Sequence, residues 1–116
     1  MGIKDIIKIF IRAEDSIKTA MEIIDKGSRG IALILDDEQR LVGTVTDGDI
    51  RRAILKGLSL EEPVKAIMNS NFIFVTQNYS RMLVTTIFKN RGIMQLPVLD
   101  DEMRVVDVIF YHEFFE

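Results

Sequence analysis

Cysteine is absent from this 116-residue sequence, and histidine occurs once, as His112. Without cysteine the chain can form no disulfide bond and no thiolate metal site. A single histidine excludes a metal site built from several histidines of one chain. Because no nucleophile or carboxylate partner is evident for His112, we interpret it as a surface or packing residue rather than a pH switch or general base. We expect no catalytic activity and no required cofactor.

Long apolar runs are also missing. No stretch approaches the roughly 18 apolar residues that a membrane-spanning helix needs, and residues 1–5 lack the apolar core of a signal peptide. The net charge of −3 argues against nucleic-acid binding, which usually uses a basic surface. These features favour a cytoplasmic protein that binds neither membranes nor nucleic acid.

The sequence does contain an internal repeat. It is 47% hydrophobic and 28% charged, as expected for a folded domain. Shifting it by 64 positions aligns residues 9–50 with residues 73–114 without a gap, and ten of these 42 positions are identical. The acidic run Asp36-Asp37-Glu38, for example, falls on Asp100-Asp101-Glu102. One supersecondary unit is therefore used twice.

Each repeat predicts the order strand, helix, strand, strand, helix. The three strands are expected at residues 9–11, 32–35 and 41–45, and again at 73–75, 96–99 and 105–110. The closing helices start near Asp47 and Tyr111, and the first ends at Lys56-Gly57 with Gly57 as a left-handed cap.

The helix after the first strand is amphipathic in both repeats. Asp15 or Ser16 caps it in the first repeat and Ser80 in the second. Its apolar face combines positions spaced three and four residues apart. These positions are Ile17, Ala20, Met21 and Ile24 in the first repeat, and Leu83, Val84, Ile87 and Phe88 in the second.

A single unit of about 45 residues has too little interior to be stable alone. We therefore expect one α+β domain, in which two β-α-β-β-α units pack through their sheets with pseudo-two-fold symmetry and leave clefts where they meet. Repeat one spans about residues 1–57, a linker spans 58–62, and repeat two spans about 63–116. Pro63 suits the first turn of a short helix that continues to Met68.

The segment Gly43-Thr44-Val45-Thr46-Asp47-Gly48-Asp49-Ile50 resembles the cystathionine-β-synthase-type (CBS) repeat. That family's pattern is a glycine, apolar residues, a threonine or serine, two variable residues and an aspartate. Gly43, Thr46 and Asp49 match these positions, and Leu96-Pro97-Val98 resembles the family's apolar-Pro-Val strand. The resemblance implies a tandem CBS pair, or Bateman module, with a regulatory rather than catalytic role.

A narrower resemblance covers residues 43–53, 57–60 and 91–98. These segments are similar to CBS pairs fused ahead of sugar-phosphate nucleotidyltransferase domains. The resemblance implies control of a fused or partner nucleotidyltransferase. No glycine-rich nucleotidyltransferase signature occurs in the sequence, so an excised regulatory domain and a stand-alone protein both remain open.

The family resemblance also implies a ligand site. It predicts an adenosine-containing ligand such as AMP, ADP, ATP or S-adenosylmethionine. Its polar side would be Val45, Thr46, Asp49 and Arg52, and its apolar surface for the base would be Ile73 and Phe74. A carboxylate can accept hydrogen bonds from both ribose hydroxyls, and a helix N-terminus offers free N–H groups to phosphate.

The second repeat departs from the family pattern at the equivalent positions. Asp107, Phe110 and Glu113 replace the glycine, threonine and aspartate. Phe110 cannot form a side-chain hydrogen bond, and Glu113 is one methylene longer than aspartate. The resemblance therefore implies one better-formed site rather than two.

Structural interpretations compete with these functional ones. Thr46-x-x-Asp49 also matches a capping box. Arg51 and Arg52 are either phosphate ligands or a solvated helix face, and the acidic runs are better explained as solvated hairpin turns than as a metal cluster. A module that only dimerises, without any ligand, is the alternative function. Family members usually associate through their helices, which implies a homodimer, and the aromatic C-terminus predicts burial against a partner.

Overall fold

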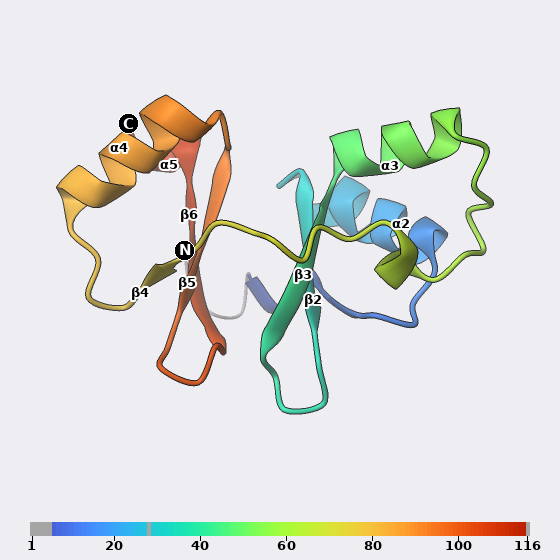
Figure 1. Cartoon of the computed structure of the whole chain (residues 1–116), viewed down its shortest axis with the longest axis horizontal. Helices are drawn as coiled ribbons and strands as arrows, with labels where there is room; N and C mark the ends of the chain where they lie inside the picture. Colours follow the sequence, from blue (N-terminus) through green and yellow to red (C-terminus); the bar gives the residue numbers. More distant parts are fainter. Residues whose placement is uncertain (1–5, 28, 116) are drawn as a thin grey trace.

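The computed structural model describes residues 6–27 and 29–115, which form two lobes side by side (Figure 1). The first lobe contains β1 (Phe10–Arg12), α2 (Ile17–Gly27), β2 (Ile31–Leu35), β3 (Leu41–Thr46) and α3 (Asp47–Leu55). The second contains β4 (Val75–Thr76), α4 (Arg81–Arg91), β5 (Gln95–Leu99), β6 (Val105–Phe110) and α5 (Tyr111–Phe114). A 3₁₀ turn, η1 (Val64–Ala66), lies between them. The predicted repeat limits at residues 1 and 116 lie outside the described residues.

Each lobe has its own three-stranded mixed sheet, ordered β1-β2-β3 and β4-β5-β6. The two sheets have the same register. Ile11 pairs with Ile34 in the parallel part of the first sheet, and Val75 pairs with Val98, 64 positions later, in the second. The antiparallel ladders correspond in the same way, including a shift in register directly after Ile34 and Val98. The predicted α+β fold of two β-α-β-β-α units is confirmed.

The lobes are related by a pseudo-two-fold axis near the hairpin turns. Arg40 and Arg104 are equivalent residues, and they form an antiparallel bridge with each other. Their preceding residues, Gln39 and Met103, share a left-handed backbone with φ of 67° and 68°. The two sheets bury a common apolar core made of Ile6, Ile9, Ile31, Leu33, Leu35, Leu41, Leu99, Val105, Val108 and Phe110.

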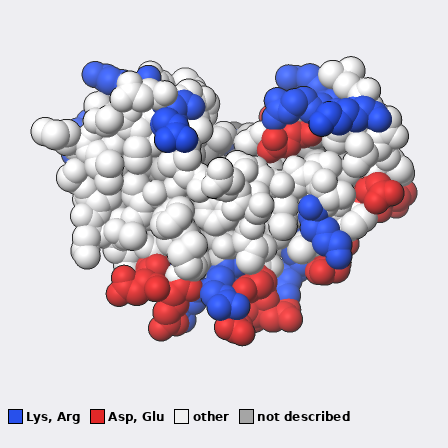
Figure 2. Space-filling model, in the orientation of Figure 1, with Lys and Arg blue, Asp and Glu red and all other residues white. Residues whose placement is uncertain are grey.

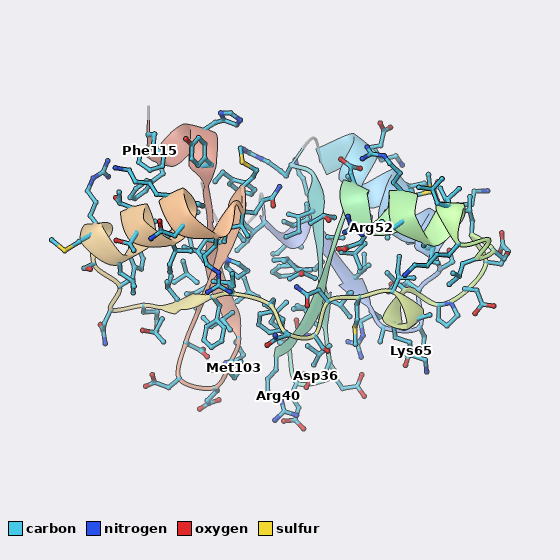
Figure 3. All side chains as sticks on the ribbon, turned by 45° about the horizontal axis from the view of Figure 1, so that its top comes forward. Asp36, Arg40, Arg52, Lys65, Met103 and Phe115 are labelled. Atoms are coloured by element: carbon cyan, nitrogen blue, oxygen red, sulfur yellow. The ribbon has the colours of Figure 1, made fainter. Side chains whose placement is uncertain are left out.

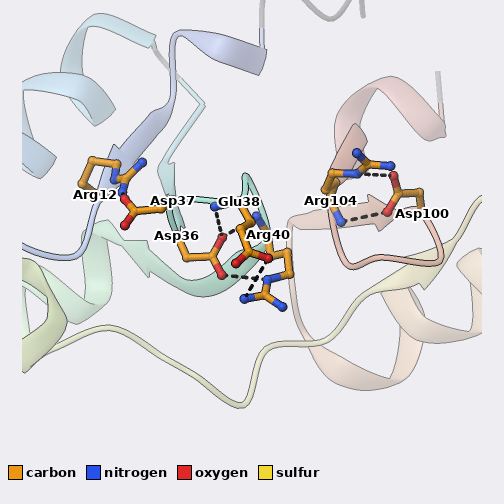
Figure 4. A network of polar contacts seen from close by, with 7 residues as sticks. All are labelled: Arg12, Asp36, Asp37, Glu38, Arg40, Asp100 and Arg104. Atoms are coloured by element: carbon orange, nitrogen blue, oxygen red, sulfur yellow. Dashed lines mark hydrogen bonds and ion pairs between the residues drawn. The ribbon is translucent and has the colours of Figure 1, made fainter.

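The acidic runs form two hairpin turns with the same polar network (Figure 4). Asp36 accepts a backbone hydrogen bond from Arg40 at 2.9 Å and pairs with the Arg40 Nε at 2.8 Å. Asp100 and Arg104 repeat both contacts at 2.9 Å. The backbone N–H groups of the two arginines hold the pKa of Asp36 and of Asp100 below its usual value. The prediction of hairpin turns is confirmed.

Helices α2 and α4 begin where their capping residues predict. The Ser16 hydroxyl accepts from the Thr19 N–H, and the Ser80 hydroxyl accepts from the Leu83 N–H, both at 3.1 Å. The buried face of α2 is Ile17, Ala20 and Ile24, while α4 buries Val84 and Phe88. Leu83, which we expected on the buried face of α4, is exposed.

Strand β4 is shorter than the sequence predicts, because Pro97 lacks an N–H group. In the first lobe the Leu33 N–H donates to the Ile9 carbonyl at 2.8 Å, which holds the start of β1 against β2. The residue equivalent to Leu33 is Pro97, which has no N–H to donate to Ile73. Strand β4 therefore starts at Val75, and the chain just before it is not bound to the sheet.

The segment between the repeats packs on the first lobe. The Leu60 and Glu62 carbonyls accept hydrogen bonds from the first turn of α2, and Val64 is fully buried in the core beneath α2 and α3. The chain remains against this lobe until Asn69, which exchanges two backbone hydrogen bonds with Thr44. The helix predicted from Pro63 to Met68 is shorter than expected, because only the 3₁₀ turn η1 forms there and ends at Ala66. Helix α3 ends at Leu55, and Gly57 has the expected left-handed φ of 85°.

Candidate functional site

A cleft of about 630 Å³ opens between the two repeats. The surface is visibly hollowed between the lobes in Figure 2. One wall comes from the first repeat, at the end of β3 and the start of α3. The other comes from the chain before β4, from the end of α4 and from β5. The lining residues are Gly30, Ile31, Thr44, Thr46, Asp47, Gly48, Asp49, Asn69, Asn71, Phe72, Ile73, Arg91, Gly92, Ile93, Met94, Gln95 and Pro97.

The polar wall is built on a complete capping box at the start of α3. The Thr46 hydroxyl accepts from the Asp49 N–H at 3.4 Å. Asp49 Oδ2 in turn accepts from the Thr46 N–H at 3.0 Å and from its hydroxyl at 3.1 Å. The structural interpretation of this pair is thus confirmed, and both side chains still line the cleft. The first-turn N–H groups of Asp47 and Gly48 have no partner within a helix.

Arg52 lies on α3 (Figure 3), and its side chain reaches the same carboxylate. Its Nη2 donates to Asp49 Oδ1 at 2.7 Å. The guanidinium passes over Gly48, where a Cβ atom would lie 3.2 Å from Nη1. Arg52 therefore neutralises Asp49 from outside the cleft, in a neighbouring groove that Asp49 also lines.

The opposite wall is mainly apolar and carries one arginine. Phe72 and Ile73 belong to the segment that Pro97 leaves free of the sheet, and Ile93 and Met94 precede β5. Arg91, the last residue of α4, also lines the cleft. An apolar wall that faces hydroxyl, carboxylate and backbone N–H groups suits a ligand with a flat apolar part and a polar part.

Of the six residues predicted for the site, three line this cleft: Thr46, Asp49 and Ile73. Val45 is fully buried in the core beneath α2 and α3, so its side chain supports the wall from behind. Arg52 reaches the site only through Asp49. Phe74 is outside the lining, although its ring lies 5.9 Å from that of Phe72.

Sequence reasoning missed Phe72, Arg91 and Gln95. The signal for Phe72 was Pro97, whose missing N–H shifts the start of the strand by two residues. Arg91 was detectable as a basic residue in the last turn of a helix that leads back to the site. Gln95 stands at the equivalent of Ile31, and both residues line the cleft. Nothing in the sequence distinguished it from an ordinary strand residue.

The charges of the cleft are divided between its walls. Asp47 and Asp49 lie at the start of α3, and Arg91 lies across from them. Within residues 6–27 and 29–115, no group of three or more histidine or acidic side chains is arranged to hold a metal ion. His112 packs edge-on against the Tyr111 ring, with centroids 5.6 Å apart. Across the same described residues, no helix is long and apolar enough to cross a membrane.

Solved structures with the same fold include several CBS pairs. The CBS domain pair of protein MJ0100, in complex with 5′-methylthioadenosine and S-adenosyl-L-methionine, is 26% identical and superposes with a TM-score of 0.82. The superposition covers 92% of this chain and 84% of the MJ0100 domain pair. The CBS domain protein PAE2072 from Pyrobaculum aerophilum, complexed with AMP, has a TM-score of 0.82 at 21% identity, over 90% of this chain and 81% of that one. The second likeness concerns the fold alone.

Among curated proteins, similar sequences include an uncharacterized protein of Helicobacter pylori strain J99, 35% identical over 91% of this chain and 32% of its own length. A probable arabinose 5-phosphate isomerase of Haemophilus influenzae is 32% identical over 77% of this chain and 27% of its own length. The chain thus spans about a third of these relatives. The CBS domain family model matches residues 3–56 and again residues 64–116. The chain belongs to the CBS domain family and consists of a tandem pair of its repeats.

Proposed function

We propose that this CBS pair is a regulatory module that binds an adenosine-containing small molecule in the cleft between its repeats. AMP, ADP, ATP and S-adenosylmethionine are the candidates. The observation that carries the proposal is the composition of the cleft. A capped helix start with Thr46 and Asp49 faces an apolar wall with Phe72 and Ile73. The likeness to a CBS pair crystallised with adenosyl compounds supports it.

The chemistry of the two walls suits the parts of such a ligand. Asp49 Oδ2 is occupied by Thr46, so a ribose hydroxyl would share Oδ1 with Arg52 or displace it. The base would lie against the apolar wall formed by Phe72, Ile73 and Ile93. The N–H groups of Asp47 and Gly48 are available to an anionic group of the ligand. Asp47 and Asp49 would repel this group, and the positive charge of Arg91 would offset the repulsion.

A ligand in this cleft would touch both repeats, which is what regulation needs. If the two lobes differ slightly in orientation between two states, a ligand that contacts both lobes binds these states with different affinity. We propose that the controlled enzyme acts on a sugar phosphate and is fused to the module or associated with it. The nucleotidyltransferase resemblance supports one such enzyme, and the arabinose 5-phosphate isomerase relatives support another.

The alternative is a ligand-independent dimerisation module. It is favoured by apolar side chains exposed on two helices. Leu55 at the end of α3 and Met82 at the start of α4 are each 79% exposed. The C-terminal aromatic residues argue less strongly for a partner, because Tyr111 and Phe114 pack on Phe88 within their own lobe. Phe115 remains partly exposed (Figure 3).

The experiment that separates these functions is a calorimetric titration of the four candidate ligands into wild type and an Asp49→Asn variant. Asparagine keeps an acceptor for the Thr46 N–H but loses the charge. Loss of charge-assisted contacts should weaken binding by about tenfold or more, equivalent to ~1.5–3 kcal/mol. Asp101→Asn, in an exposed hairpin turn, is the matched control and should bind as wild type does. If wild type binds none of the ligands below millimolar concentration, the dimerisation function replaces this one.

A further inference from the structure

The repeat symmetry defines a second cleft position, on the opposite side of the pseudo-two-fold axis. Its residues follow by adding or subtracting 64. Phe110 stands where Thr46 stands in the first cleft, and Glu113 stands where Asp49 does. Arg29 is the equivalent of Ile93, which lines the apolar wall of the first cleft. At this second position an arginine thus faces a phenylalanine and a glutamate.

Arg29 makes contacts with both of these residues. Its Nη1 pairs with Glu113 Oε2 at 3.0 Å, and its guanidinium carbon lies 4.6 Å from the centre of the Phe110 ring. Phe110 itself is 6% exposed. The Arg29 guanidinium thus occupies the ring face of Phe110 and the carboxylate of Glu113, the two groups that a ligand would contact at this position.

The backbone of Arg29 is held in place by the wall of the first cleft. Gln95 Nε2, which lines that cleft, donates to the Arg29 carbonyl at 3.0 Å. The next residue, Gly30, has φ of +74°, and a Cβ there would lie 3.1 Å from the same Gln95 nitrogen. Glycine permits both the left-handed backbone and the close approach of the amide. Arg29 is therefore directed into the second position by a cross-repeat contact.

Two further features distinguish the second position from the first. The segment equivalent to Phe72 and Ile73 is tied to the sheet, because Leu33 donates to the Ile9 carbonyl, and Ile9 is buried. The helix that follows Phe110 has four residues, and Phe110 provides no side-chain cap. The strand at this position is thus held in the sheet and the helix start has no side-chain cap, so a ligand would bind here more weakly than in the first cleft.

We propose that Arg29 is a built-in occupant of the second cleft, so that the module binds one ligand per chain rather than two. The occupied position is a fixed cross-repeat contact, in which Arg29 joins the first lobe to the start of α5 in the second. The ligand stoichiometry rests on the proposed function of the first cleft. The position of Arg29 does not rest on it, so the two can be tested apart.

The first test needs no ligand. Nuclear magnetic resonance of the arginine side chains should show an upfield ring-current shift for Arg29, and Phe110→Leu should abolish it. Arg81 provides the matched control, since its guanidinium lies 4.2 Å from the Phe114 ring, outside either cleft. Phe114→Leu should move the Arg81 signals and leave those of Arg29 unchanged. Arg29 signals at random-coil positions in wild type would overturn the proposal.

The second test measures stoichiometry by calorimetry with the ligand that binds wild type. Wild type and Phe110→Thr/Glu113→Asp, which restores the family residues but keeps Arg29, should each bind one ligand per chain. Adding Arg29→Ser to that pair should raise the number to two. Two ligands per chain while Arg29 is present, or one per chain in the folded triple variant, would overturn the proposal. If the triple variant does not fold, the double variant and the resonance shift decide it. If no ligand binds wild type, the proposed function fails, and the resonance shift alone decides the role of Arg29.

Discussion

Replacing Thr46 separates its role in holding α3 from its role in the cleft. Its hydroxyl both accepts from the Asp49 N–H and donates to Asp49 Oδ2. Thr46→Ala removes both contacts, and loss of an N-cap side chain typically costs about 1 kcal/mol, with a range of ~0.5–2. For a domain of this size we expect the melting temperature to fall by about 4 °C. Thr46→Ser keeps the hydroxyl and should remain close to wild type.

Ser80→Ala is the matched control, because it removes a cap of the same kind from a helix that starts away from both clefts. The Ser80 hydroxyl accepts from the Leu83 N–H at 3.1 Å, so its removal should also cost about 0.5–2 kcal/mol. Only Thr46→Ala should also weaken ligand binding, by up to about tenfold for one neutral hydrogen bond.

The assays are thermal unfolding without ligand and calorimetric titration with the ligand that binds wild type. If Thr46→Ala melts within about 1 °C of wild type, the capping argument is wrong, since even the smallest expected loss exceeds this. If Ser80→Ala weakens binding as much as Thr46→Ala does, the lower affinity reflects a less stable domain and not a lost contact.

Three other predictions follow from the fold and the cleft. The pKa of Asp36 and of Asp100 is lower in the folded protein than the ordinary value of 3.8. Their stabilisation is therefore fully present above that value and is lost as pH falls through the folded pKa. The double variant Asp36→Asn/Asp100→Asn should have a lower free energy of unfolding in urea than wild type at about pH 6, and this difference should shrink below about pH 3.5. A difference that does not change with pH would show that the two carboxylates do not stabilise the folded state. Leu55→Glu/Met82→Glu should convert a homodimer to a 13.3 kDa monomer in light scattering, and a wild-type monomer at high concentration would argue against dimerisation. Pro97→Ala restores an N–H group directed at the Ile73 carbonyl, so β4 should lengthen and ligand affinity should fall; rapid hydrogen exchange at the new alanine amide would show that no such bond forms.

The repeat made most of the fold predictable. Because one offset relates the two halves, each local sequence pattern occurs at two equivalent positions, and the two occurrences support the same prediction. The helix caps Ser16 and Ser80 are an example. The same offset predicted that the acidic runs are turns, and both turns have the same hydrogen bonds around Asp36 and Asp100. Local residue types determine these features, so no knowledge of distant contacts was needed.

The candidate site was predictable only where it depends on local sequence. Thr46 and Asp49 belong to one helix start, and their positions followed from their spacing. The opposite wall depends on how the second repeat meets the first, which no single segment encodes. To predict that Phe72 rather than Phe74 lines the cleft, one must know that Pro97 in β5 has no N–H to donate to the neighbouring chain. The family resemblance placed Val45 on the polar side, while strand alternation directs its side chain into the core.

The same proline explains why two halves with the same fold produce unequal clefts. In the first lobe a donor at Leu33 binds the chain at Ile9 to the sheet, and the inner side of that chain joins the shared core. In the second lobe the missing donor leaves Phe72 and Ile73 free to form a wall of the open cleft. A substitution that removes one N–H group thus enlarges the cleft on one side of the axis. On the other side, the strand is intact, and Arg29 lies over the Phe110 ring and pairs with Glu113.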